Sequence, residues 1–354
     1  MKPFEGKRVL ITGGTGSLGK TLVRRILSGE MGDPEKLIIF SRDEAKQHFM
    51  RVEYQNRIAA TDEIIYHNFQ QKLEFRIGDV RDYSSIASVM PGVDFVINAA
   101  AMKQVPTCEY FPYEAIITNV MGAENIVRAI QEHHLSVDTV VGVSTDKACK
   151  PVNVMGMTKA VQERVFIQAN MRCPGTRFVC TRYGNVLASR GSVIPLFHEQ
   201  IRNGGPVTVT TPEMTRFLLS LQDAVSLVFD AIKGAQRGET WVPRAPSSLV
   251  TNIAKALIGD RDIQIIYTGI RPGEKTHEIM ISEEEAYRTV DRGKYYGIVP
   301  MLPEVSGDEV FTSARTGEYS SAEDVMTLKE TEQLLRDRKL MLEDASPREV
   351  EILR

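Results

Sequence analysis

An acidic and a basic side chain stand next to each other where an apolar run ends. Asp146 and Lys147 follow residues 139–143, which have the composition of a buried strand. A carboxyl group and an amine held at the end of such a strand can donate and accept protons. The same two residues could instead form a salt-bridged turn, so the pair by itself leaves both interpretations open.

A glycine-rich turn near the N-terminus has the form of a phosphate-binding loop. Its glycines stand between an apolar run at residues 7–12 and a helical pattern at residues 18–28. Glycine lets the backbone approach a pyrophosphate, and the following helix N-terminus offers free N–H donors. The GxxGxxG spacing is that of short-chain dehydrogenase/reductases. We expect the loop to bind a dinucleotide through Gly13, Thr15, Gly16, Ser17, Leu18 and Gly19.

The residues after the second predicted strand, 36–40, should contact the adenosine ribose. An acidic residue there favours NAD, whereas basic residues accommodate the 2′-phosphate of NADP. The sequence places Ser41, Arg42 and Lys46 there, together with Asp43. We therefore expect NADP, with NAD as the alternative because of Asp43, although a solvated, charged helix start would look the same.

Two further segments follow predicted strands where such folds hold the adenine and let the dinucleotide lie flat. The first is acidic and the second consists of small residues. They contribute Asp79, Val80, Ala99, Ala100 and Ala101.

A second reactive spacing follows the acid–amine pair. Met155 and Lys159 lie four positions apart where a helix opens, with a helical pattern at residues 158–170. Short-chain dehydrogenases normally carry a tyrosine in the place of Met155, and this tyrosine takes the hydroxyl proton. Methionine cannot transfer a proton. Either the site is inactive, or the proton chemistry has moved to Asp146 and Lys147.

These motifs need a sheet that gathers the strand ends. Apolar runs alternate with helical patterns at residues 7–12, 36–40, 73–77, 93–97, 139–143 and 177–180. This alternation predicts a parallel, doubly wound sheet whose carboxyl edge carries the site.

After Asn185, glycines and prolines break the chain into shorter pieces. We therefore predict an α/β, Rossmann-like fold with a smaller, mixed α/β substrate-binding domain. Residues 1–184 are expected to bind NADP, and residues 185–302 mainly the substrate, interlaced with the first domain. Residues 303–354 are expected to be a C-terminal extension, with one amphipathic helix over 322–342.

Composition narrows the class of protein. The 354 residues suffice for two domains of about 150 residues. The net charge of −3, from 43 basic and 46 acidic side chains, argues against nucleic acid or an anionic membrane as the main partner. The four cysteines form no CxxC pair and stand apart from the histidines, so neither a metal site nor a disulfide framework is expected. Without an apolar run of about 18 residues or room for a signal peptide, the expected location is cytoplasmic.

Nearly the whole chain resembles the soluble UDP-N-acetylglucosamine 4,6-dehydratases of the extended short-chain dehydrogenase family. The matching blocks occur in order at residues 41–46, 99–103, 144–148, 182–186, 189–193, 214–217, 270–275 and 319–321. Some members of this family carry Met-xxx-Lys and remain active, and the residues around Met155 are similar to theirs. The resemblance therefore implies an active enzyme that supplies deoxy sugars for surface glycans.

The resemblance implies a reaction without net oxidation. Hydride leaves sugar C4 for NADP⁺, a base removes the C5 proton, the C6 hydroxyl leaves as water, and hydride returns to C6. The cofactor can therefore stay tightly bound. Lys147 would be the C5 base, with its pKa lowered toward neutrality by burial and nearby positive charge. Asp146 would protonate the C6 oxygen and take the C4 proton, directly or through Thr145 or water, while Lys159 holds the nicotinamide ribose.

The resemblance also implies how the UDP end of UDP-N-acetylglucosamine is bound. Guanidinium groups such as those of Arg216 and Arg271 suit a diphosphate because they offer paired donors. Glu274 suits the uridine ribose hydroxyls as an acceptor. The expected ligands are Lys103, Asn185, Thr210, Arg216, Arg271 and Glu274.

Two other functions stay open. A UDP-sugar 4-epimerase would share the fold and the UDP site, but should need the tyrosine that Met155 replaces. A non-catalytic NADP-binding protein is favoured by Met155 and opposed by the substrate motifs. Neither the C5 stereochemistry, nor the group that takes the C4 proton, nor the downstream pathway can be read from the sequence.

Assembly is inferred from the family alone, which forms homo-oligomers, as dimers or hexamers. The family usually pairs the helices expected at residues 113–132 and 158–170. An apolar stripe on the first helix would fit such pairing, but core burial explains it equally well. Its members are Ile116, Ile117, Val120 and Val127.

Overall fold

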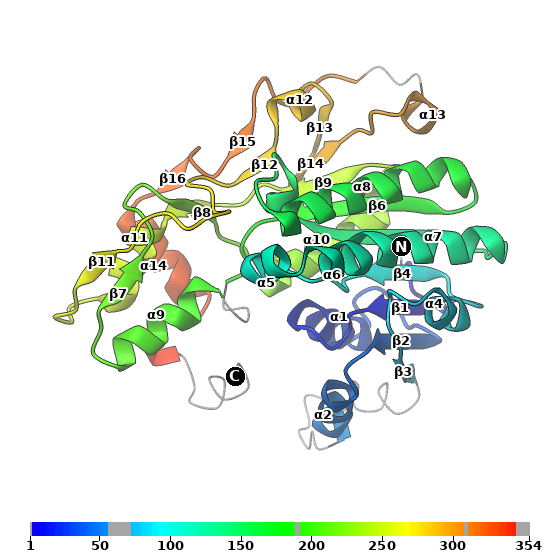
Figure 1. Ribbon diagram of the computed structural model, residues 1–354, viewed down its shortest axis with the longest axis horizontal. Helices are drawn as coiled ribbons and strands as arrows, with labels where there is room; N and C mark the ends of the chain where they lie inside the picture. Colours follow the sequence, from blue (N-terminus) through cyan, green and yellow to red (C-terminus); the bar gives the residue numbers. More distant parts are fainter. Residues whose placement is uncertain (1, 56–71, 188–191, 308–310, 345–354) are drawn as a thin grey trace.

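The computed structural model describes residues 2–55, 72–187, 192–307 and 311–344. Its largest element is a sheet with the strand order β13-β14-β9-β6-β5-β4-β1-β2-β3 (Figure 1). The strands from β9 to β3 are parallel, while β14 and β13 are antiparallel. The bounds are β1 (Arg8–Thr12), β2 (Lys36–Ser41), β3 (Leu73–Ile77), β4 (Phe95–Asn98), β5 (Thr139–Thr145), β6 (Arg177–Tyr183), β9 (Thr240–Pro243), β13 (Thr289–Arg292) and β14 (Tyr295–Ile298).

Helices cover both faces of this sheet, because successive side chains of a strand point to opposite faces. In β1, Val9 and Ile11 pack into the core shared with α1 (Ser17–Leu27) and α10 (Leu221–Gly234). Leu10 packs into the opposite core, formed with α4 (Tyr83–Val89), α7 (Gly122–Glu132) and α8 (Val154–Arg172). The predicted doubly wound α/β fold is confirmed, and the six predicted apolar runs all form strands of this sheet.

The predicted helix over residues 113–132 is built from three consecutive segments. They are α6 (Pro112–Ala115), the π-helical turn η2 (Ile116–Met121) and α7. The other helical segments of this part are α2 (Glu44–Gln55), α5 (Val105–Tyr110) and η3 (Asp146–Ala148).

A smaller part with its own apolar core lies beside the sheet (Figure 1). Its strands pair as β16-β10-β8 and β11-β7, while the pair β12-β15 packs with β9 and β14 of the large sheet in a further core. The bounds outside the large sheet are β7 (Val207–Val209), β8 (Thr215–Phe217), β10 (Ser247–Leu249), β11 (Ile265–Tyr267), β12 (Ile279–Ile281), β15 (Tyr319–Ser320) and β16 (Val325–Met326). The helices after β6, apart from α10, are α9 (Val193–Arg202), α11 (Val250–Ile258), α12 (Glu283–Ala286), α13 (Pro303–Ser306), α14 (Leu328–Asp337) and η4 (Leu342–Asp344).

The chain passes between the two parts more than once. After β8 it returns to the large sheet through α10 and β9, and again through β13 and β14. Residues 185–302 therefore contribute to both parts, and the predicted domain boundaries stay a proposal.

The single helix predicted over residues 322–342 is wrong. Residues Val325–Met326 pair with β10 as strand β16, and α14 begins only after Thr327. The Thr327 hydroxyl accepts a hydrogen bond from the Glu330 N–H at 3.3 Å, which caps the helix and fixes its start. Leu335 anchors α14 in the smaller core, so this segment of the C-terminal region is part of the fold.

Two further features concern membrane-spanning helices and the cysteines. Within the described ranges, no helix combines the length and the apolar character needed to cross a membrane. The four cysteines, Cys108, Cys149, Cys173 and Cys180, are free and buried.

Candidate active site

The loop after β5 holds the predicted acid–amine pair. Thr145 ends the strand, and the pair follows on η3 at the carboxyl edge of the sheet, where doubly wound folds bind their ligands. The Thr145 hydroxyl donates to Asp146 Oδ1 at 2.9 Å, and Lys147 Nζ donates to the same oxygen at 3.1 Å. Asp146 is fully buried. The short contacts hold the two reactive groups in one geometry.

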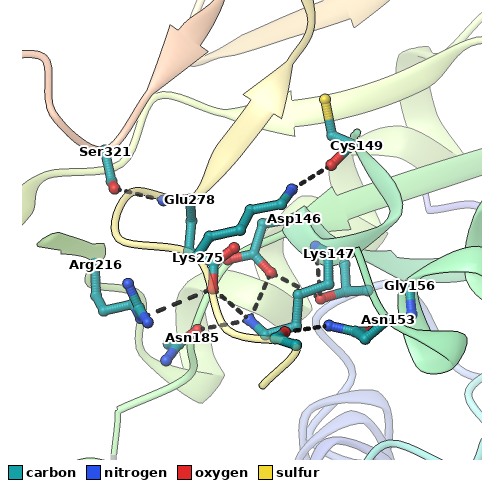
Figure 2. Close-up of polar contacts among 12 residues, drawn as sticks. Asp146, Lys147, Cys149, Asn153, Gly156, Asn185, Arg216, Lys275, Glu278 and Ser321 are labelled. Atoms are coloured by element: carbon teal, nitrogen blue, oxygen red, sulfur yellow. Dashed lines mark hydrogen bonds and ion pairs between the residues drawn. The ribbon is translucent and has the colours of Figure 1, made fainter. Parts of the chain in front are cut away.

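Three other segments complete a cluster around the amine (Figure 2). Lys147 Nζ lies 3.0 Å from Glu278 Oε1, just before β12, and 3.2 Å from Asn185 Oδ1, after β6. Arg216 of β8 places its Nε 3.8 Å from the same Glu278 oxygen. We call Asp146, Lys147, Asn185, Arg216 and Glu278 the Lys147 cluster. It joins both parts of the protein at the carboxyl edge of the sheet.

The charge of Lys147 differs from the prediction. Burial lowers the pKa of this amine, but the negative charges of Asp146 and Glu278 outweigh burial and raise it. The predicted lowering toward neutrality is wrong because a second carboxylate faces the amine. Lys147 is therefore an ammonium group at neutral pH, and it must release a proton before it can accept one.

Asp146 shifts in the direction that suits proton exchange. Burial raises its pKa, and the charge of Glu278 raises it further, against the lowering effect of Lys147 and Thr145. Its Oδ2 atom is buried and has no hydrogen-bond partner among the described residues. A raised pKa makes this carboxylate a better proton acceptor than an exposed aspartate, and its acid form can donate the proton again.

Met155 and Lys159 lie on the first turns of α8 but in different surroundings. Met155 is buried in a small apolar cluster formed with α5 and α6, so it has a packing role. Lys159 Nζ donates to the Val143 carbonyl at 2.5 Å and to Gln162 Oε1 at 2.6 Å. Burial lowers the pKa of Lys159 to about 8.

The glycine loop has the geometry of a phosphate cradle. Gly13 has a φ of +66°, and a Cβ there would lie 2.8 Å from Ala100 Cα. A Cβ at Gly19 would lie 2.5 Å from the backbone of Gly14. Gly16 is the N-cap of α1 and makes no side-chain capping bond, so the first N–H groups of α1 are free for an anion. These residues fit the pyrophosphate of a dinucleotide.

The remaining predicted cofactor residues surround this loop. Ala99 and Ala100 follow β4, and Val80 is buried against Gly122. Ala101 is exposed. The other loop residues lie in or beside the first turn of α1: Thr15, Ser17 and Leu18.

Charged side chains follow β2, as predicted for the adenosine side. Ser41 is buried at the end of the strand. Arg42 is largely exposed, with Nη1 3.8 Å from Asp79 Oδ2. Lys46 Nζ lies 2.6 Å from Asp43 Oδ2 at the start of α2. Each predicted cation therefore faces a carboxylate, and a 2′-phosphate would compete with that carboxylate for the cation.

The predicted UDP ligands divide into two groups. Asn185 and Arg216 belong to the Lys147 cluster. The other four lie on separate segments: Lys103 after β4, Thr210 after β7, and Arg271 and Glu274 on the loop before β12. Arg271 is exposed, whereas Glu274 Oε2 is buried without a partner among the described residues. Part of one matching block, residues 189–191, lies outside the described residues.

Two residues of the site were not predicted. Glu278 supplies the second carboxylate, and Lys275 donates from Nζ to the Cys149 carbonyl at 2.6 Å, which ties its loop to the end of η3. Lys275 closes the matching block 270–275, and Glu278 precedes the apolar run of β12. The sequence signal that could have identified Glu278 is a charged residue directly before a buried strand.

The doubly wound sheet and the glycine loop before α1 give the protein the Rossmann-like fold of extended short-chain dehydrogenase/reductases. Residues 9–300 match the family described as polysaccharide biosynthesis protein. The chain belongs to this family.

Known proteins resemble the chain over most of its length. The UDP-glucose 4-epimerases of Rickettsia conorii and Rickettsia prowazekii are 48% and 47% identical, each over 83% of both chains. The structure of Pen from Bacillus thuringiensis superposes with a TM-score of 0.84 at 32% identity, covering 96% of this chain and 99% of that one. DesIV from Streptomyces venezuelae, a dTDP-glucose 4,6-dehydratase solved with NAD and TYD bound, has a TM-score of 0.62 at 21% identity. It covers 76% of this chain and 86% of its own, and it supports the fold alone.

Proposed function

We propose that the protein is a UDP-N-acetylglucosamine 4,6-dehydratase that forms a UDP-4-keto-6-deoxy-N-acetylhexosamine. The Asp146–Lys147 pair at the end of β5 carries this proposal. Removal of water across C5 and C6 needs a base for the C5 proton and an acid for the departing oxygen. The chain offers one of each at the carboxyl edge of the sheet, while the tyrosine position holds the buried Met155.

The proposed cofactor is tightly bound NADP. The glycine loop and the N-terminus of α1 would hold its pyrophosphate, Arg42 and Lys46 its 2′-phosphate, and Lys159 its nicotinamide ribose. When bound, the nicotinamide supplies the oxidation at C4 and the reduction at C6. NAD is the alternative, because Asp43 follows the same strand as Arg42 and Lys46, and Asp79, after the neighbouring β3, faces Arg42.

Asp146 is proposed to move one proton through the whole reaction. As a carboxylate it takes the C4 hydroxyl proton while C4 becomes a ketone. It then donates that proton to the C6 oxygen, which leaves as water when the C5–C6 double bond forms. The raised pKa of Asp146 supports both roles, because the same group has to accept and to release a proton.

Lys147 is proposed to remove the C5 proton and to return a proton there at the end. It first has to lose the proton that its neighbours stabilise. Because Asp146 then carries the C4 proton, Glu278, with Oε1 3.0 Å from Nζ, accepts the Lys147 proton and returns it after C5 has been reprotonated. The C5–H bond electrons then form the C5–C6 double bond conjugated with the C4 ketone.

The UDP group is proposed to bind between the cluster and the loop before β12. Arg216 and Arg271 suit the diphosphate, and Asn185, Lys103 and Thr210 supply further polar contacts. Glu274 suits the ribose hydroxyls, because its Oε2 atom is buried and lacks a partner among the described residues.

We also propose a homo-oligomer, a dimer or a hexamer. Large apolar side chains are exposed on the predicted pairing helices, with Ile116 at 45% and Val161 at 48%. Val127, by contrast, is fully buried in the core and cannot contribute to such a surface.

A UDP-sugar 4-epimerase is the second candidate, favoured by the names of the Rickettsia relatives. Product mass separates the two activities. Incubation with UDP-N-acetylglucosamine should yield a product lighter by one water, with a 4-ketone visible by NMR. An isomer of unchanged mass, from this sugar or from UDP-glucose, would instead establish the epimerase.

A further inference from the structure

Two buried carboxylates share one ammonium group in the Lys147 cluster. Lys147 Nζ lies 3.1 Å from Asp146 Oδ1 and 3.0 Å from Glu278 Oε1. Asp146 is fully buried and Glu278 is 3% exposed. Like charges at short range raise the pKa of the carboxyl group that has less positive charge around it.

The surroundings of the two carboxylates are unequal. Glu278 is faced by further positive charge, from Arg216 on β8 and from Lys275 on its own loop (Figure 2). Its backbone N–H donates to Ser321 Oγ at 2.9 Å, which fixes the start of β12. The neighbouring His277 is bonded to the Thr215 hydroxyl through Nδ1.

The two carboxylates differ in the charge of their partners, although each keeps one buried oxygen, Asp146 Oδ2 and Glu278 Oε2, without a hydrogen-bond partner among the described residues. Whereas Glu278 faces the charged Arg216 besides Lys147, the described partner of Asp146 besides Lys147 is the uncharged Thr145 hydroxyl. Asp146 Oδ2 lies near the place where a Gly184 side chain would stand, 3.2 Å away. A buried carboxylate with a neutral second partner is costlier to keep charged than one that faces a second cation.

We propose that Glu278 is a positioning residue that holds the negative charge opposite Lys147, and thereby leaves Asp146 as the carboxyl group that exchanges protons with the sugar. The catalytic part of this inference rests on the proposed function, whereas the division of charge does not. Glu278 acts through its neighbours and need not touch the substrate.

The directions of the pKa shifts agree with this division. Burial raises the pKa of Glu278, but Lys147 and Arg216 outweigh it and lower the value. The pKa of Asp146 is raised by burial and then by the charge of Glu278. Removing the charge of Glu278 should therefore lower the pKa of Asp146.

A titration without substrate tests the division of charge. The full-length protein with its cofactor, labelled with ¹³C at aspartate side chains, is titrated by NMR, and Asp146→Asn identifies the signal of interest. The midpoint should lie above the ordinary value of about 3.9 and should fall by about one pH unit or more in Glu278→Gln. An unmoved or rising midpoint overturns the inference.

Two control variants test whether the shift comes from the charge of Glu278. Glu239→Gln removes another buried, ion-paired glutamate, which contacts Arg292 far from the cluster, and should leave the midpoint where it is. Glu278→Asp keeps the charge and should keep the midpoint raised. If Glu278→Gln does not fold, the wild-type protein is labelled at glutamate side chains instead. The inference then requires the titration midpoint of Glu278 to lie below that of Asp146.

Kinetics test the catalytic consequence. With UDP-N-acetylglucosamine, Glu278→Gln should lower kcat about 10- to 100-fold at neutral pH, with little change in KM, and should move the pH optimum toward acid. Glu278→Asp should restore most of the rate. An unmoved pH optimum together with a lowered melting temperature would mean a merely structural role.

The titration and the kinetic assay test the division of charge and the proposed function separately. A shifted Asp146 midpoint in a protein that does not dehydrate this sugar leaves the charge division standing and removes the proposed function. If the protein dehydrates the sugar but the Asp146 midpoint does not move in Glu278→Gln, the proposed function stands and the division of charge is overturned.

Discussion

The side chain of Asn153 joins the start of α8 to the loop that carries Arg271 and Glu274. Its Oδ1 accepts the Gly156 N–H at 2.8 Å and so caps the helix, while its Nδ2 donates to the Gly273 carbonyl at 2.8 Å. One residue therefore orients both the helix that presents Lys159 and the loop proposed to bind UDP.

The two bonds of Asn153 can be separated by substitution. Asn153→Asp keeps the capping acceptor but loses the donor, so it should fold normally and bind UDP about 2- to 12-fold more weakly, the value of one net hydrogen bond. Asn153→Ala should in addition lose about 1 kcal/mol of stability. Calorimetry with UDP and thermal unfolding measure the two effects. Wild-type UDP affinity in Asn153→Asp would show that the bond to Gly273 does not position the loop.

Replacing the amine of Lys147 should stop the reaction after C4 oxidation and before C5 deprotonation. Lys147→Met should still oxidise C4, because hydride transfer precedes the step that needs the base. Reduced cofactor should then accumulate, seen by its near-ultraviolet absorbance, without release of water and without solvent deuterium at C5. Lys233→Met, on the exposed surface of α10, is the matched control and should react normally. A folded, cofactor-loaded Lys147→Met protein that still exchanges the C5 proton removes Lys147 from this role.

Cofactor preference should depend on Arg42. In the free protein its guanidinium pairs with Asp79 across 3.8 Å and remains largely exposed, so it can turn to a phosphate. Arg42→Ala should weaken NADP binding relative to NAD about 10- to 150-fold, the range for one charge-assisted hydrogen bond. Arg128→Ala, which removes a surface ion pair on α7, should leave the ratio unchanged. Fluorescence titration with both cofactors measures it, and an equal loss for both would place the 2′-phosphate elsewhere.

Acid should destabilise the protein through Glu285. Burial would raise the pKa of this carboxyl group, but Arg182, at 2.8 Å, lowers it to about 2 from the ordinary 4.5. Because folding stabilises the ionised carboxylate of Glu285, its contribution to stability is full above about pH 4.5. This contribution is lost as the pH falls toward about 2. At about 1.4 kcal/mol per pH unit, it amounts to roughly 3 kcal/mol.

Urea unfolding at several pH values tests this prediction. The stability gap between the wild type and Glu285→Gln should be wide at pH 7 and should narrow steadily as the pH falls below about 4.5. A gap that is independent of pH would mean that the loss comes from packing instead of charge.

Several features of this protein follow from residues that are neighbours in the chain. The apolar runs, the glycines between strand and helix, and the adjacency of Asp146 and Lys147 are all local patterns. Local patterns determine which segments become strands, and the alternation with helices allows few arrangements other than a doubly wound sheet. The fold and the place of the reactive pair were therefore predictable.

Only the tertiary structure decided how the pair is charged. Glu278 reaches Lys147 because β12 follows a loop that Lys275 and Asn153 tie to η3 and α8, and no spacing along the chain contains that contact. The direction of the Lys147 pKa depends on it, since burial and two carboxylates act in opposite senses and only their distances determine which prevails. The same holds for Arg182, whose partners Glu163 and Glu285 come from opposite sides of β6 in the sequence. Coulomb energies in a buried cluster depend on separations of a few ångströms, and those separations exist only after the chain has folded.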